Sequence, residues 1–110
     1  MLKKTIDTIE EKIHHVDSIA DETKTELLNL LSTLKSEIAD LSATQSETAE
    51  SITGFTQISA HEATRMEKNP DLLNLSLKGL RASVNELETT HPKLAETVNS
   101  ICHILSNMGI

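Results

Sequence analysis

Apolar residues recur along this chain at alternating intervals of four and three positions. The first series lies near the N-terminus and consists of Leu2, Ile6, Ile9, Ile13 and Val16. This spacing returns to one face of an α-helix, so it predicts a helix over residues 2–16. Polar residues fill the positions between them, which leaves a narrow apolar stripe like the seam of a coiled coil.

Three later series repeat this spacing and predict helices over residues 22–42, 70–88 and 92–107. Their apolar positions are Leu27, Leu31, Leu34, Ile38 and Leu41, then Leu73, Leu77, Leu80, Val84 and Leu87, then Leu94, Val98, Ile101, Leu105 and Met108. In the helix over 70–88, Leu72 and Leu75 are expected to widen the buried face.

Residues that start or stop helices mark the ends of the last two segments. Asn69 is a good N-cap, and Pro70 suits the first helical position, where its missing N–H costs nothing. Pro92 cannot continue one helix but can begin the next. Gly109 is expected to end the final helix.

The segment over residues 45–67 is the least clear part of the pattern. Its apolar stripe is thin, and many of its residues are Ser or Thr, which are indifferent helix formers. We predict a helix here, either separate from the helix over 22–42, with Thr44 and Glu47 as a capping box, or continuous with it. Gly54 is expected to mark a close approach of another backbone.

These segments predict an all-α protein, an antiparallel bundle of four to five amphipathic helices in a single domain over residues 1–110. An N-terminal hairpin spans 1–42, a middle helix 45–67 and a C-terminal hairpin 70–108. A chain of this length has difficulty burying every stripe, so we expect the bundle to be completed by self-association, as a homodimer or higher homo-oligomer. The C-terminal hairpin has the best marked ends, and we expect it to be the most stable unit.

Composition and charge narrow the possible functions. The 110 residues include one aromatic side chain, Phe55, and carry a formal net charge of −7. Such a chain lacks the groups that bind nucleic acid, and an anionic membrane would repel it. It has no apolar run of ~18 residues and no signal-peptide pattern, so we expect a cytoplasmic protein. The single cysteine, Cys102, agrees with a reducing compartment.

His61 and Glu62 begin a stretch similar to the zinc-binding pattern H-E-x-x-H. The position of the second histidine is Arg65, whose guanidinium has no lone pair for a metal. We therefore expect Glu62 and Arg65, three positions apart on a helix, to form a surface ion pair.

Two Glu-x-x-His spacings, Glu11–His14 and Glu88–His91, match pairs that hold di-iron centres in helical bundles. The first pair lies off the apolar stripe and the second lies at a helix boundary, so a metal centre is only the alternative interpretation. Cys102 is expected to be a small buried apolar residue, and on a helix His103 points roughly 100° away from it. No catalytic, cofactor-binding or metal-ligating residue is predicted.

Short motifs in the second half of the chain resemble a family of short bacterial proteins, the domain of unknown function numbered 4404. The motifs are Glu50–Ile52 with Gly54–Phe55, Ser59–Arg65, Asn69–Pro70, His91–Pro92 and Met108–Gly109–Ile110. The likeness is close over residues 50–110, whereas residues 1–49 are similar only in being an amphipathic hairpin. The resemblance implies an α-helical bacterial protein, and it implies no activity, cofactor or catalytic residue.

The sequence as a whole favours a non-enzymatic, self-associating helical protein, a structural or adaptor module. The alternative is a metal-binding bundle of the di-iron type that uses the two Glu-x-x-His pairs. An unidentified protein partner would be contacted through an amphipathic helix. We expect no cofactor, no nucleic acid and no membrane among its partners.

Overall fold

The computed structural model describes residues 2–108, and this part of the chain forms five α-helices. They are α1 (Leu2–His14), α2 (Asp21–Ser42), α3 (Ser46–Thr64), α4 (Pro70–Val84) and α5 (Pro92–Met108). A short 3-10 turn, η1 (Asn85–Leu87), follows α4. The predicted all-α fold is confirmed, and the expected helix end at Gly109 lies outside the described residues.

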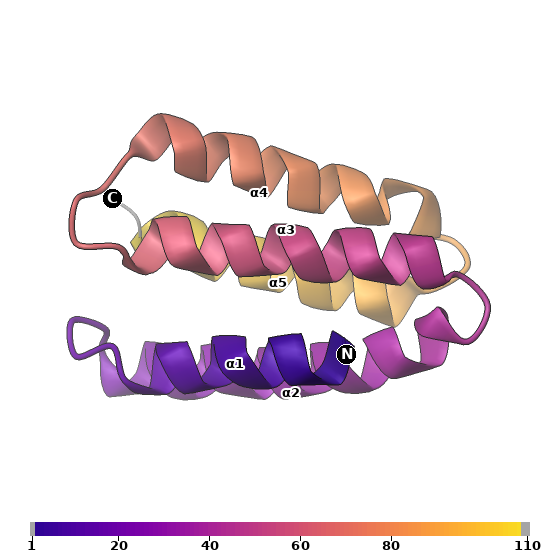
Figure 1. Ribbon diagram of the computed structural model, residues 1–110, viewed down its shortest axis with the longest axis horizontal. Helices are drawn as coiled ribbons and strands as arrows, with labels where there is room; N and C mark the ends of the chain where they lie inside the picture. Colours follow the sequence, from indigo (N-terminus) through magenta and orange to yellow (C-terminus); the bar gives the residue numbers. More distant parts are fainter. Residues whose placement is uncertain (1, 109–110) are drawn as a thin grey trace.

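Consecutive helices run in opposite directions and form two layers (Figure 1). In the nearer layer α3 lies between α1 and α4, and α2 and α5 lie behind them. α3 contacts all four other helices. The loops that follow α1 and α3 are at one end of the bundle, and those that follow α2 and α4 are at the other.

The start of α4 agrees with the signals in the sequence. Asn69 Oδ1 accepts a hydrogen bond from the backbone N–H of Leu72 at 3.2 Å, and Pro70 is the first helical residue. The α-helix ends earlier than expected, at Val84, because the chain tightens into the 3-10 turn there.

The boundary between α2 and α3 follows the sequence less closely. Residues 43–45 lie outside both helices, so the alternative of one long bent helix is wrong. Thr44 does not form the predicted capping box, because the N-cap of α3 is Gln45 and its side chain makes no capping hydrogen bond. The chain therefore turns here without the side-chain cap that the spacing indicated.

The narrow stripe of α1 is buried within the single chain. Ile6, Ile9 and Ile13 have exposed fractions of 0%, 3% and 0%. The helix lies against both α2 and α3, which cover the stripe from two sides. The argument from this stripe to self-association therefore does not hold, and any contact between copies needs another surface.

Lys35 of α2 also binds α1 from the outside. Its Nζ lies 2.5 Å from Asp7 Oδ1 and 2.6 Å from Glu10 Oε1. The hydrogen bond with Lys35 lowers the pKa of Asp7, and hydrogen bonds with the two carboxylates raise the pKa of Lys35. The stabilisation of the fold by these ion pairs is therefore lost as the pH falls through the lowered pKa of Asp7 or rises through the raised pKa of Lys35. Solvent and salt screen these exposed pairs.

Small side chains allow α3 to occupy the centre. Its buried residues include Ala49, Thr53, Thr56, Ser59, Ala60 and Ala63. The hydroxyl groups of Thr53 and Thr56 donate to carbonyl oxygens one turn earlier in the same helix, at 2.9 Å and 2.7 Å. These polar groups need no partner on another helix, so the neighbouring helices can pack closely against them.

This central position changes the expected order of stability. α3 cannot separate from the bundle without exposing the faces of the other helices that it covers. We therefore expect its amides to exchange with solvent as slowly as those of the C-terminal hairpin, in contrast to the expectation from the sequence.

The close approach in this fold occurs at Gly79 of α4 and not at Gly54 of α3. A Cβ added at Gly79 would overlap the ring of Phe55, whereas a Cβ at Gly54 would meet no atom within 4 Å. The expectation for Gly54 is therefore wrong. The aromatic ring of α3 occupies the space in which a side chain at Gly79 would lie.

We predict opposite effects for the two glycine-to-alanine changes. Gly54→Ala should raise the free energy of unfolding by about 1 kcal/mol, the difference in helix propensity. Gly79→Ala should lower it by about 1–2 kcal/mol, because overlap with Phe55 outweighs the same gain in propensity. Urea unfolding followed by circular dichroism measures both changes.

The Phe55→Ala background provides the control for this pair. Without the ring, Gly79→Ala should stabilise the protein by up to about 1 kcal/mol, because only the propensity gain remains. The assigned contact would be contradicted if Gly79→Ala cost the same with and without the ring.

A second prediction concerns a buried hydroxyl. Ser59 Oγ is buried without a hydrogen-bond partner in the described structure, whereas Ser76 Oγ donates to the carbonyl oxygen of Leu73 at 2.8 Å. Ser59→Ala should therefore raise the free energy of unfolding by about 1–2 kcal/mol. Ser76→Ala, the matched control, should be neutral or lower it by up to about 1 kcal/mol. Equal effects in urea unfolding would count against this assignment.

Candidate functional site

Glu62 and Arg65 form a partly buried ion pair at the C-terminal end of α3. Arg65 Nη1 lies 3.0 Å from Glu62 Oε1, so the predicted pair is confirmed. Glu62 is 8% exposed, whereas the side chain of Arg65 is 32% exposed, so the pair lies at the edge of the core with its carboxylate more buried than expected. The pair therefore belongs to the packing between α3 and the following loop.

His61 connects this ion pair to α1. Its Nδ1 lies 3.1 Å from Nζ of Lys12, and its Nε2 lies 4.0 Å from Glu62 Oε2. A lysine ammonium only donates, so Nδ1 is the acceptor in the contact with Lys12. The histidine thus lies between α1 and the Glu62 carboxylate.

The two Glu-x-x-His pairs lie at opposite ends of the bundle. Glu11 and His14 are in the last turn of α1, whereas Glu88 and His91 lie in the turn before α5 (Figure 1). Between residues 2 and 108, no three His, Cys, Asp or Glu side chains gather where they could hold one metal ion. The structure therefore does not assemble the two pairs into the centre that the alternative interpretation requires.

Cys102 is a free, fully buried thiol in α5, in agreement with its predicted role as a small apolar residue. Burial raises the pKa of this thiol, and the nearby charge of Arg81 opposes the effect only in part. His103 is exposed on another side of the helix, where it cannot act as a base for the thiol. A buried, protonated thiol is a poor nucleophile.

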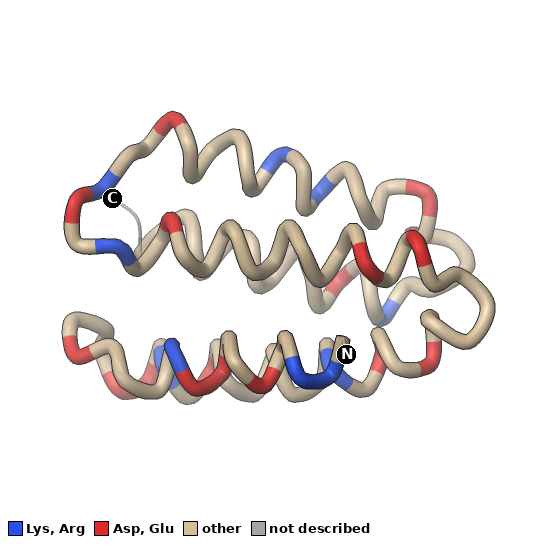
Figure 2. The backbone as a smooth tube through the Cα atoms, viewed as in Figure 1, with Lys and Arg blue, Asp and Glu red and all other residues tan. Residues whose placement is uncertain are grey.

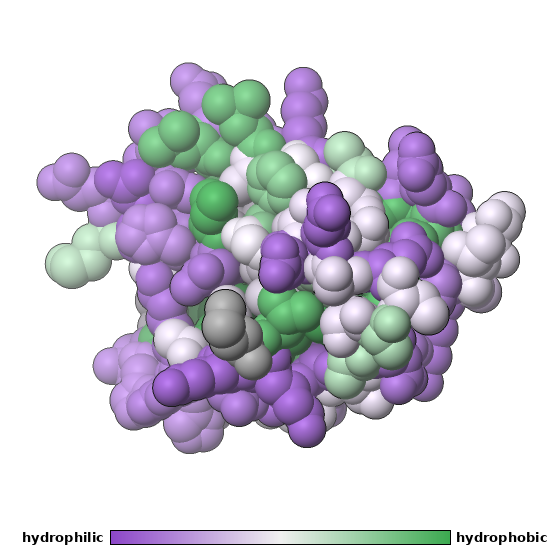
Figure 3. Space-filling model, turned by 45° about the vertical axis from the view of Figure 1, so that its right-hand side comes forward, coloured by the Kyte–Doolittle hydropathy of each residue, from purple (hydrophilic) through white to green (hydrophobic). Residues whose placement is uncertain are grey.

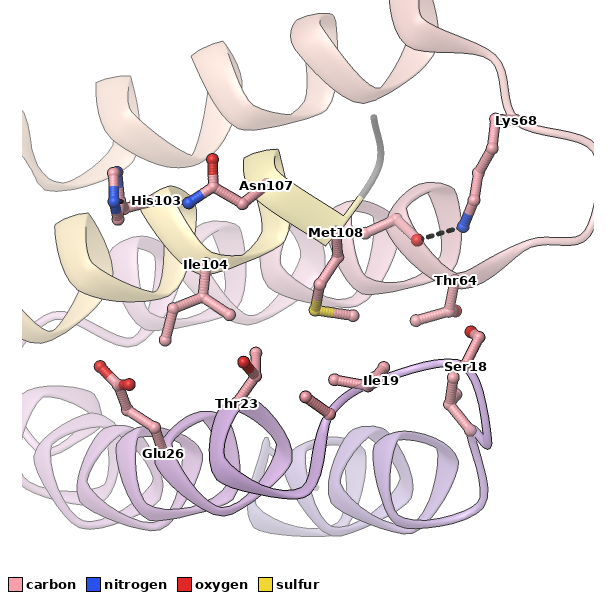
Figure 4. A pocket seen from close by; sticks show the side chains of 13 residues that line it. Ser18, Ile19, Thr23, Glu26, Thr64, Lys68, His103, Ile104, Asn107 and Met108 are labelled. Carbon is pink, nitrogen blue, oxygen red and sulfur yellow. Dashed lines mark hydrogen bonds between the residues drawn. The ribbon is translucent and has the colours of Figure 1, made fainter.

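A cavity of about 530 Å³ opens at the end of the bundle where α3 and α5 finish (Figure 4). Ile19, Ile104 and Met108 give it apolar walls, and Glu26 and His103 are among its polar lining residues. The lining side chains come from the loops before α2 and after α3 and from the ends of three helices.

The polar groups of this cavity are not arranged as an acid–base couple. Lys68 Nζ at its rim donates to the carbonyl oxygen of Ala63 at 2.5 Å, and His103 Nε2 lies 3.5 Å from Asn107 Nδ2. Among the described residues, neither side chain forms an ion pair with Glu26. Lys68 and His103 are thus held by neighbouring groups of their own part of the chain.

Large apolar side chains are exposed on the side of the bundle formed by α3 and α4. The exposed fractions are 50% for Ile58, 99% for Met66, 42% for Leu72 and 63% for Leu75. We call these four residues the apolar patch. In Figure 3, hydrophobic side chains gather in green at the upper left, over the beginning of α4.

Contacts between α3 and α4 place Ile58, Leu72 and Leu75 of the patch next to one another. Phe55 lies against Gly79, and the two helices run antiparallel. Ile58, one turn after Phe55, is therefore level with Leu75, one turn before Gly79. Leu72 extends the same face by another turn.

The exposure of Leu72 and Leu75 contradicts the sequence analysis, which assigned both to the buried face of this helix. The helices α3 and α5 cover only the side of α4 that carries Leu73, Leu77 and Leu80. Leu75 points away from that side, so no element of the described chain covers it.

Charged side chains accompany the patch along α4. Asp71 lies in its first turn, and Lys78 and Arg81 follow in its second half, as Figure 2 shows. All three are exposed, and none has an ion-pair partner between residues 2 and 108. The exposed side of α4 is thus acidic at its start and basic towards its end.

A comparison with protein-family models matches residues 2–110 to the family described as Domain of unknown function (DUF4404). The chain belongs to this family. The match extends the resemblance, which the motifs carried over residues 50–110, through α1 and α2 to nearly the whole chain. A search of curated proteins and a search of solved structures each found no match. Within residues 2–108, no helix is both long enough and apolar enough to cross a membrane.

The environment of Cys102 predicts a thiol that reacts only when the protein unfolds. At pH 8, modification by a disulfide reagent should be at least about a hundredfold slower than in urea-unfolded protein, because both burial and the raised pKa suppress the thiolate. A cysteine placed at Ser32, which is exposed on α2, is the control and should react quickly. Equal rates at the two positions would contradict the burial of Cys102.

Proposed function

We propose that this protein is a non-enzymatic helical module that associates with a second copy of itself through the apolar patch. The observation that supports the proposal is the contrast between a complete core and four large apolar side chains left at the surface. Contiguous exposed apolar side chains on a folded domain mark contact surfaces for other proteins.

The proposal of a non-enzymatic role is supported by the state of the reactive groups. The one thiol is buried with a raised pKa, and the buried threonine hydroxyls of α3, at Thr53 and Thr56, donate to its own backbone. The histidine beside Glu62 is engaged by Lys12. The engagement of these groups in the fold supports a role that does not depend on nucleophilic or acid–base catalysis.

The proposed cellular role is that of a structural or adaptor module in the cytoplasm. The free cysteine is compatible with a reducing compartment. Self-association would present two copies of every other surface to a further protein partner, including the cavity at the ends of α3 and α5.

Sedimentation velocity over a range of concentrations tests self-association. We expect a dimer at about 100 μM, and we expect Leu75→Glu to weaken it at least about tenfold, because it places a charge in the centre of the patch. Ser32→Glu, an exposed change of equal charge on α2, is the control and should leave the dimer intact. A wild-type protein that stays monomeric at this concentration would rule the proposal out.

A further inference from the structure

We propose that two copies pair through their α4 helices, antiparallel and related by a two-fold axis that passes beside Leu75. This inference rests on the proposed self-association and names the surface, the direction and the register of the contact. The reasons are the order of side chains around α4 and the order of charges along it.

Leu75 lies at the centre of the exposed side of α4. The buried residues Leu73, Leu77 and Leu80 lie on the opposite side, against α3 and α5. At about 100° per residue, Leu75 points almost directly away from their mean direction. It is 63% exposed, although it stands in the middle of the helix.

The two flanks of Leu75 differ in character. Leu72 and Gly79 are two turns apart on the flank towards α3, as the contact of Gly79 with Phe55 shows. Asp71 and Lys78 are also two turns apart and lie on the other flank, towards α5. One flank is therefore apolar, with the Phe55 ring against the glycine, and the other is charged.

Antiparallel pairing of two such helices brings equal flanks together. With Leu75 on the axis, Asp71 lies about 1.5 Å along the helix from Lys78 of the partner subunit, at 1.5 Å rise per residue. The two copies of Asp71 are then about 12 Å apart along the axis, and the two copies of Lys78 about 9 Å apart. Each contact thus forms two equivalent ion pairs and keeps like charges separated.

A parallel two-fold arrangement would not form these ion pairs. It brings unlike flanks together, so the charged flank of each copy would face the apolar flank of the other, and Asp71 and Lys78 would lie against apolar surface without a partner of opposite charge. The order of charges on α4 therefore selects the antiparallel pair.

The apolar flank fits the same register. Leu72 lies about 1.5 Å along the axis from Gly79 of the partner subunit, where the ring of Phe55 fills the space of the missing side chain. Leu72 would therefore pack against that ring, and such a contact buries apolar surface of both side chains. Leu72, Leu75 and Ile58 would all lose exposed surface in this arrangement.

The register can be tested by reversing the charges one at a time. Asp71→Lys makes the charged flank wholly basic, and Lys78→Asp makes it wholly acidic, so each variant alone should dimerise about tenfold more weakly than wild type. In an equal mixture of the two variants, the heterodimer pairs the basic flank of Asp71→Lys with the acidic flank of Lys78→Asp. The heterodimer should therefore be favoured about tenfold over either homodimer in native mass spectrometry. The doubly reversed variant should dimerise about as well as wild type.

Two controls accompany this experiment. Asp21→Lys removes an exposed first-turn acid from α2, with the same change in net charge, and should leave dimerisation unchanged. Circular dichroism should show that every variant remains helical, because all the changed positions are exposed.

The possible failures are distinguishable. If wild type dimerises but the reversed variants dimerise equally well and mix statistically, this inference is overturned and the proposed self-association uses another surface. If both variants are weakened but their mixture shows no preference for the heterodimer, the antiparallel register is wrong. If wild type is monomeric, the proposed function itself fails and the inference fails with it.

Discussion

The position of α3 among four other helices is the constraint on which the rest of the structure depends. A helix covered on several sides would hold its neighbours apart if large side chains surrounded it. α3 avoids this with alanines and with hydroxyl groups bonded to its own backbone, as at Thr53 and Thr56. Most of the large core residues come instead from the other four helices. One slender helix thus allows four bulkier helices to share a single core.

Periodic burial explains why much of this fold could be predicted from the sequence. The helices α1, α2, α4 and α5 each carry leucines or isoleucines at four-three spacing, and burial of such a face dominates helix stability in proteins. The spacing shows where the buried face is centred, but neighbouring helices decide how wide it is. Leu72 and Leu75 were misassigned for this reason. Gly54 and Gly79 both lie inside helices of similar local sequence character. Only the packing of the Phe55 ring of α3 against Gly79 of α4 distinguishes the two positions.

The candidate sites were predictable to the same extent and for the same reason. Spacing along one helix predicted the Glu62–Arg65 pair and the separation of Cys102 from His103, both of which the structure contains. The burial of Glu62 and the contact of His61 with Lys12 depend on packing between helices, which the local sequence does not encode. The apolar patch could not be identified, because its leucines have the same spacing as leucines of the core. The role of Asp71 and Lys78 beside the patch became evident only once the structure showed which side of α4 is exposed.

The contact between Phe55 and Gly79 has a consequence for how this family can change in evolution. The width of one aromatic ring sets the spacing of α3 and α4, so the two positions share a fixed volume. A larger residue at position 79 would require a smaller one at position 55, and the two substitutions would have to arise together or in quick succession. Relatives should therefore show correlated exchange at these two positions, with the sum of side-chain volumes more constant than either alone.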